Sequence, residues 1–225
     1  MKKHAVNSQA AHGARNSLNP ITLALGVIAA LVMAYIAAKY WDSPIAYDSA
    51  LARYAALLAV FAVAGLAVIN WQDPNDSIRW EIQPLTVEYA STLLGRAVVL
   101  LLVGLVLEAA ITYVGQLELV NSAVADEDLA AYYIFAGVAE EFLFRGVACN
   151  LLARYAHHHV AVPASAALFM VAHVQVYGAD PALLAVQFVL GVLWGYAYLY
   201  WRDITPNVLA HTLKNLMAVG SLLVL

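Results

Sequence analysis

Two adjacent glutamates, Glu140 and Glu141, lie in a segment that is apolar enough to be within a lipid bilayer. The segment, residues 131–155, reads AYYIFAGVAEEFLFRGVACNLLARY. An ionised carboxylate near the centre of a bilayer costs at least about 2.5–3.5 kcal/mol on insertion scales. Two such groups in succession, with Arg145 close behind, are therefore candidates for a functional site.

Helical spacing separates the two glutamates. Glu141 and Arg145 are four residues apart, so they share a helix face and can form an ion pair. Glu140 is rotated by about 100° from Glu141, because an α-helix has about 3.6 residues per turn. We therefore predict that Glu141 is the structural partner of Arg145 and that Glu140 faces a cavity. A structural clamp between helices is the alternative interpretation of the Glu–Arg pair.

Two later apolar segments supply imidazoles. Phe169 and His173 share a helix face in LFMVAHV, as do His211 and Asn215 in LAHTLKNL. A glutamate can take a proton from water while a histidine positions that water. A second histidine and a carboxamide can donate hydrogen bonds to the oxyanion of a tetrahedral intermediate. This set of groups suits hydrolysis, although Glu140, His173 and His211 could also bind a zinc ion.

Other reactive side chains have simpler interpretations. Lys214 is expected to snorkel toward the cytoplasmic edge. Glu108 could reach the headgroups or pair within the bundle. His157–His159 are interpreted as a solvated cytoplasmic cluster, because adjacent histidines in a loop do not easily converge on a metal. Cys149, the single cysteine, is a packing residue, and it excludes an intrachain disulfide or a multi-cysteine metal site.

The composition places the chain in a membrane. Of its 225 residues, 64% are hydrophobic and 12% are charged, and its mean hydropathy is +0.75. A soluble domain is typically about 45–50% apolar and about 25% charged. The net charge of −4 gives no reason to expect a nucleic-acid partner. We predict an all-α fold, a polytopic transmembrane bundle of about seven spanning or partly spanning helices.

The helices are expected over residues 21–40, 50–71, 91–115, 129–155, 160–177, 181–201 and 205–225. The first is too long for a cleavable signal peptide and is interpreted as a retained signal anchor. Residues 1–19 are expected to be a polar, frayed cytoplasmic tail and 20–225 a single transmembrane domain, with its catalytic part at about 129–225. Gly191 and Gly195 form a GxxxG motif, which predicts close helix packing.

Basic residues in short loops predict the orientation. With the N-terminus in the cytoplasm, the inside would hold Lys2, Lys3, Arg15, Arg79, Arg154 and Arg202. The outside would hold only Lys39 and Arg53. We therefore expect a multi-pass protein with a cytoplasmic N-terminus. Its small size and simple topology suggest a bacterial inner membrane.

Three motifs occur in a fixed order along the chain. They are EEFLFR at 140–145, FMVAH at 169–173 and HTLKN at 211–215. Together they resemble the CAAX prenyl protease and bacteriocin-processing family, which includes the Ras-converting enzyme. That family has the signature Glu-Glu-x-x-x-Arg, then Phe-x-x-x-His, then His-x-x-x-Asn or Asp. The resemblance covers about 129–225, and the first three helices match only in being hydrophobic.

The resemblance implies an intramembrane endopeptidase with a water-filled catalytic cavity among its helices. Glu140 would activate water together with His173. His211 and Asn215 would stabilise the oxyanion. The residues that hold the first glutamate and its helix in place would be Glu141 and Arg145.

The resemblance leaves two mechanisms, a glutamate mechanism without metal and a zinc-dependent version of the same peptidase. We favour the first, because Asn215 is a poor zinc ligand and a good oxyanion donor. No cofactor is then required. The partners would be the bilayer and a membrane-associated protein or peptide substrate, lipidated or not. In this family, substrates include prenylated C-termini, bacteriocin leaders and sorting signals.

A non-catalytic membrane bundle is the competing class, either a proton-coupled transporter or a scaffold or immunity protein. A buried Glu, an Arg and two His could relay protons or pair helices. A transporter predicts inverted repeats, and the sequence has no detectable repeat. A catalytically inactive relative would be expected to lack a motif residue, and none is missing. The geometry of Glu140 and His173 distinguishes the classes, because a peptidase needs them close enough to share a water.

Overall fold

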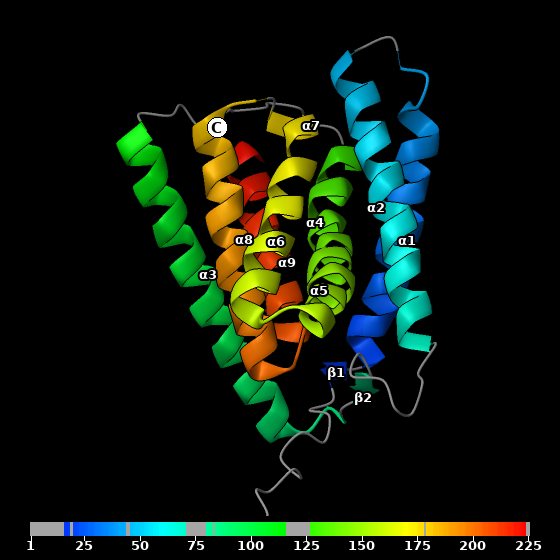
Figure 1. The fold of residues 1–225 in the computed structure, drawn as a ribbon. Helices are drawn as coiled ribbons and strands as arrows, with labels where there is room; N and C mark the ends of the chain where they lie inside the picture. The colour runs from blue at the N-terminus through cyan, green and yellow to red at the C-terminus, as the bar shows by residue number, and fades with distance from the viewer. Residues whose placement is uncertain are drawn as a thin grey trace, which may run out of the picture.

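The computed structural model describes residues 16–18, 20–43, 46–70, 80–82, 84–115, 127–177 and 179–223. Long helices run up and down side by side (Figure 1), so the predicted all-α bundle is confirmed. In chain order the helices are α1 (Pro20–Tyr40), α2 (Ala46–Asn70), α3 (Val87–Gly115), α4 (Glu127–Glu141), η2 (Phe142–Cys149), α5 (Asn150–Tyr155), α6 (His158–Ala172), α7 (Val174–Tyr177), α8 (Pro181–Trp201) and α9 (Thr205–Leu223). Two short strands, β1 (Asn16–Leu18) and β2 (Trp80–Ile82), complete the described elements.

Local signals fix the ends of α8, the helix whose bounds match the prediction. Its N-cap, Asp180, accepts hydrogen bonds from two backbone N–H groups at 2.9 and 3.0 Å. Pro181 occupies the first turn, where its missing N–H costs little. The helix ends at Arg202, whose φ of 55° is left-handed. The cap and the left-handed residue confine α8 to the apolar segment between them.

The helix expected over 129–155 is continuous but not uniformly α-helical. The α4 helix ends at Glu141, and the next eight residues form the π-helix η2 before α5 begins. The residues at both ends of η2 keep right-handed helical backbone angles, so the chain does not break. π-helical turns are rare and occur frequently at functional sites. Here the wider turn follows directly after the two glutamates and contains Arg145.

The expectation of a wholly frayed N-terminal tail is wrong for Asn16–Leu18. This segment pairs in parallel with Trp80–Ile82, with Asn16 opposite Trp80. Three residues are too few to show the alternation of polar and apolar side chains by which a strand is recognised in sequence. Residues 1–15 of the predicted tail lie outside the described residues.

The bundle core forms where α1 and α2 pack against α4 and η2. Its largest fully buried apolar side chains include Met33, Ile36, Tyr54, Leu58, Phe142 and Tyr198. A Cβ added at Gly26 of α1 would lie 2.9 Å from the Phe142 ring. The glycine therefore permits α1 to approach the start of η2, next to the glutamates.

The predicted GxxxG packing is confirmed between α8 and α6. A Cβ added at Gly191 would lie 2.9 Å from the Ala166 Cβ, and one added at Gly195 would lie 2.9 Å from Val162 Cγ1. Real Cβ atoms essentially never come this close. Both glycines therefore let α8 pack directly against the helix that ends at His173.

Two of the described helices are long and apolar enough to cross a membrane. They are α3, over Val87–Ile111 with a mean hydropathy of 2.3, and α8, with 1.8. Shorter apolar segments lie in α1, α2 and α6. Many large apolar side chains of α3 are exposed in the protein alone, among them Leu94, Val99, Leu102 and Val106. An apolar surface of this kind suits a lipid environment.

Candidate active site

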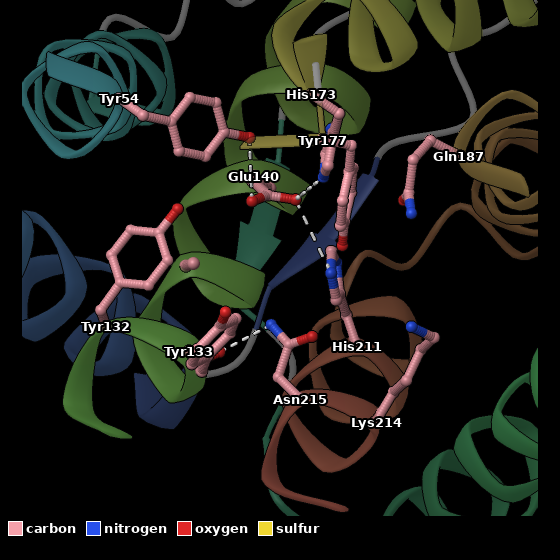
Figure 2. Close-up of a pocket in the computed structure, with 11 residues that line it drawn as sticks. Tyr54, Tyr132, Tyr133, Glu140, His173, Tyr177, Gln187, His211, Lys214 and Asn215 are labelled. Atoms are coloured by element: carbon pink, nitrogen blue, oxygen red, sulfur yellow. Dashed lines mark hydrogen bonds and ion pairs between the residues drawn. The ribbon is translucent and has the colours of Figure 1, made fainter. Parts of the chain in front are cut away.

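A pocket opens where α2, α4, α7, α8 and α9 approach one another. Its lining includes every polar side chain expected to act in hydrolysis (Figure 2). The residues are Tyr54, Tyr132, Tyr133, Ala136, Glu140, His173, Tyr177, Gln187, His211, Lys214 and Asn215. Four of them are tyrosines, so both aromatic rings and polar groups line the pocket.

Glu140 lies at the end of α4 with its two carboxylate oxygens in different surroundings. The Tyr54 hydroxyl donates a hydrogen bond to Oε1 at 3.1 Å. Oε2 lies 3.7 Å from His173 Nε2 and 3.6 Å from His211 Nε2, beyond direct hydrogen-bond distance. Oε2 is buried and has no hydrogen-bond partner in the described part of the chain. One oxygen is thus held, and the other is open between two imidazoles.

His173 is oriented by the break between α6 and α7. Its backbone N–H contacts the carbonyls of Phe169 and Met170 at the helix end, and its ring Nδ1 lies 2.8 Å from the Phe169 carbonyl oxygen. A carbonyl only accepts, so Nδ1 carries the proton. In the neutral ring Nε2 is then an acceptor, and it faces Glu140 Oε2. Two acceptors 3.7 Å apart suit a water molecule that donates to both.

Glu141 bonds to His211, the second histidine of the site. Its Oε1 lies 3.2 Å from Arg145 Nη1 and 2.9 Å from His211 Nδ1. The Asn207 carboxamide donates to its Oε2 at 3.4 Å. The predicted ion pair of Glu141 with Arg145 is present, and Glu141 in addition bonds to α9 and fixes the His211 ring. Rotation along the helix predicts that the two glutamates face different ways, but not which helix each one faces.

Arg145 is enclosed by aromatic rings. Its guanidinium carbon lies 4.5 Å from the centre of the Phe169 ring and 5.4 Å from that of Trp194. The side chain is 1% exposed. Cation–π contacts and the Glu141 carboxylate together compensate this buried charge.

Asn215 lines the pocket but is already engaged. Its Nδ2 donates to the Tyr133 carbonyl oxygen at 2.6 Å, as Figure 2 shows. The two residues expected to stabilise an oxyanion, His211 and Asn215, therefore share the pocket with Glu140. The Asn215 amide has a second N–H, which can donate to an oxyanion while the bond to Tyr133 is kept.

Tyr54 is a site residue that the sequence reasoning missed. It is buried in α2, and besides bonding Glu140 it meets the His173 ring edge-on at 5.9 Å between centroids. A signal was present, because a tyrosine inside the apolar helix segment LARYAALLAV needs a partner for its hydroxyl when it is buried. Helical spacing within α2 could not identify a partner 86 residues away.

Lys214 does not snorkel to the cytoplasmic edge as expected. Its Nζ lies 3.0 Å from Glu108 Oε2 of α3, and its side chain lines the pocket. Of the two alternatives for Glu108, pairing within the bundle is the one observed. Lys214 and Glu108 are both partly buried. Pairing the two charges offsets the cost of placing each of them away from water.

His157–His159 converge more than expected. One nitrogen from each ring lies within 4.8 Å of the others, and all three residues are exposed. They begin α6, where the His157 side chain caps the helix by accepting from the His159 backbone N–H. Repulsion from His157 lowers the pKa of His158. The start of a helix folds adjacent side chains together, which the expectation of an extended loop did not consider.

The zinc alternative can be compared with these positions. Two ligands of one tetrahedral zinc lie about 3.3–3.5 Å apart when each bond is about 2.0–2.2 Å. Glu140 Oε2 lies 3.7 and 3.6 Å from the two imidazoles, so small movements would satisfy zinc as well as a shared water. The bond from His211 Nδ1 to Glu141 would orient that ring in either case.

The comparison with known proteins gives a family match in the C-terminal part of the chain. Residues 128–217 match the model of the family described as type II CAAX prenyl endopeptidase, Rce1-like. No curated protein and no solved structure matched the chain. The matched segment contains all three motifs, whereas Tyr54 lies outside it. Residues 128–217 of this chain are therefore similar to the Rce1-like family of type II CAAX prenyl endopeptidases.

Proposed function

We propose that this protein is an intramembrane endopeptidase of the glutamate type, which hydrolyses a peptide bond in a membrane-associated protein or peptide. The observation that carries the proposal is the open Oε2 atom of Glu140. It is buried in a polar pocket, between two imidazoles that face it with Nε2. A structural clamp would instead have both carboxylate oxygens bonded, as in Glu141.

The reaction begins with a water held between Glu140 Oε2 and His173 Nε2. Glu140 takes one proton while the water oxygen attacks the scissile carbonyl carbon. The carbonyl oxygen becomes an oxyanion, to which His211 donates when Nε2 is protonated, and to which Asn215 donates with its second Nδ2–H. The intermediate then expels the amine, which takes the proton from Glu140 as it leaves.

Tyr54 acts through Glu140. Its hydroxyl bonds Oε1 at 3.1 Å, which fixes the plane of the carboxylate and directs Oε2 toward the histidines. Glu141 acts in the same way on His211. Each reacting group thus has a partner that orients it, as catalysis by positioned groups requires.

A zinc-dependent version of the same peptidase would use Glu140, His173 and His211 as ligands. A zinc ion, when bound, would activate the attacking water as a Lewis acid. The two versions differ in a direct test. The metal-free mechanism predicts that activity of the purified protein survives a chelator and that metal analysis finds less than one equivalent of zinc. Loss of activity with EDTA, restored by added zinc, would establish the metal-dependent version.

Peptidase activity can be tested without knowing the natural substrate. Membrane vesicles containing either the wild type or Glu140→Ala are incubated, and the released peptides are compared by mass spectrometry. A reporter peptide ending in a prenylated cysteine and three further residues is tested in parallel, because the matched family is named for such substrates. We expect products only with the wild type, and we expect His173→Ala to lose them as well.

Both variants must be shown to fold, by an unchanged unfolding transition in detergent. His159→Ala, an exposed residue outside the pocket, is the matched control and should retain full activity. Full proteolysis by folded Glu140→Ala or His173→Ala would refute the assignment. Identical peptides in all vesicles would favour the non-catalytic bundle.

A further inference from the structure

Gln187 is a largely buried residue whose side chain lines the pocket and has no hydrogen-bond partner in the described part of the chain. It lies on α8, lines the pocket and is 6% exposed. Nothing in the part of the chain that the structure describes hydrogen-bonds its carboxamide. By contrast, Asn215 and Lys214 in the same pocket have a hydrogen bond and an ion pair. None of its polar atoms is among the fully buried atoms that lack a hydrogen-bond partner, so the carboxamide opens on the interior of the pocket, and its presence on an apolar helix needs an explanation.

Packing does not explain it. The α8 helix is apolar around this position, reading PALLAVQFVLGVLWGYAYLYW, and a leucine would fill a similar volume. A polar residue inside an apolar helix often bonds a neighbouring helix, but Gln187 makes no such bond among the described residues. Its carboxamide is instead directed into the pocket (Figure 2), where a bound molecule would meet it.

The position of Gln187 indicates what it would bind. In the view of Figure 2 the Tyr177 ring lies between Gln187 and Glu140, so the carboxamide is set apart from the water that Glu140 would activate. A carboxamide offers two N–H donors and one C=O acceptor. The complementary pair, one C=O and one N–H, is present in the backbone of every peptide.

We propose that Gln187 hydrogen-bonds a backbone amide of the substrate beside the scissile bond, and that the substrate is therefore extended at this point. The inference rests on the proposed peptidase function. A helical segment has its backbone N–H and C=O groups bonded internally, so it offers no free amide to Gln187.

This role has a distinct kinetic signature. A bond made to the backbone away from the reacting carbon is present in the bound substrate and in the transition state alike. Its removal raises KM and leaves kcat nearly unchanged. A structural role predicts something else, a loss of stability in the protein without substrate.

The test compares wild type with Gln187→Leu and Gln187→Met in proteoliposomes. The probe is the prenylated reporter peptide together with a series of analogues, in each of which one backbone amide near the cleavage site is replaced by an ester. For both variants we expect an unfolding temperature no lower than that of the wild type, a KM about 3–10-fold higher, and a kcat within twofold. One ester position should raise the wild-type KM similarly and have no further effect in Gln187→Leu.

Three outcomes would overturn the inference. They are a clear loss of stability in both variants, an unchanged KM, and ester effects that add to Gln187→Leu at every position. If the wild type cleaves and Gln187→Leu is indistinguishable from it, only this inference fails. If the wild type cleaves none of the reporter and releases no peptide that Glu140→Ala lacks, the proposed function fails, and this inference fails with it.

Discussion

Glu140 and Glu141 are adjacent in sequence and bond to different helices. Helical rotation predicts this divergence, and the ion pair of Glu141 with Arg145 follows from their spacing. The partners from distant helices could not be predicted in the same way. Tyr54 reaches Glu140 from α2, and His211 reaches Glu141 from α9. Such contacts depend on how helices are arranged in space, which the period of a single helix does not encode.

The Tyr54 hydroxyl should contribute to catalysis through Glu140. Tyr54→Phe removes the bond to Oε1 and leaves the ring in place, so Oε2 is no longer directed toward the histidines. A hydrogen bond to a charged group contributes about 1.5–3 kcal/mol, which corresponds to roughly a 10- to 100-fold lower kcat in reporter cleavage. Tyr133→Phe is the matched control, because it removes a hydroxyl from the same pocket, and it should stay within twofold of the wild type. Equal losses in the two variants would contradict a specific role for Tyr54.

The seven predicted apolar stretches are helical close to their predicted ranges, because length and hydropathy are strong signals. Finer features of the same elements were not predictable. Nearly every residue of 142–149 is apolar, so the sequence pattern cannot distinguish the wider π turn of η2 from an α turn. The break at His173 is likewise hidden, since apolar residues continue on both sides of it. These two irregular places are the ones that position Arg145 and His173.

The contact between α6 and α8 gives a prediction at the scale of elements. Gly191→Ala would force the new Cβ against Ala166, including its Cα at 3.1 Å. Overpacking of this kind destabilises by about 1–3 kcal/mol, and it would displace α8 from the helix that ends at His173. We expect a lower unfolding temperature and reduced cleavage. Gly95→Ala is the control, because nothing lies within 4 Å of a Cβ there; it should be neutral or slightly stabilising. Equal stability of both variants would contradict the packing account.

The successive long helices run in opposite directions between the two ends of the bundle (Figure 1). The strand pair, the start of α6 and the end of α8 lie toward one end, and the end of α1 and the start of α2 lie at the other. The succession of apolar stretches predicts this alternation, whereas the loop charges predict which end faces the cytoplasm, and that orientation stays a prediction. The pairing of β1 with β2 across the tail was not predictable from three-residue segments.

Cysteine labelling in cells that produce the protein can test its orientation. Arg202→Cys and Asp42→Cys place thiols at exposed positions at opposite ends, while the native Cys149 is buried. We expect a membrane-impermeant maleimide to label Asp42→Cys in intact cells. Arg202→Cys should be labelled only after the cells are opened. The reverse pattern would show that the N-terminus faces outward.

The central claim, that Glu140 activates the attacking water, is tested most directly by the cleavage rate of Glu140→Gln. Glutamine keeps the shape and still accepts the Tyr54 bond, but it cannot take a proton. General base catalysis contributes about 10²–10⁴-fold, so the folded variant should cleave the reporter at least about 100-fold more slowly than the wild type. A folded Glu140→Gln protein that cleaves within a few-fold of the wild-type rate would contradict this account.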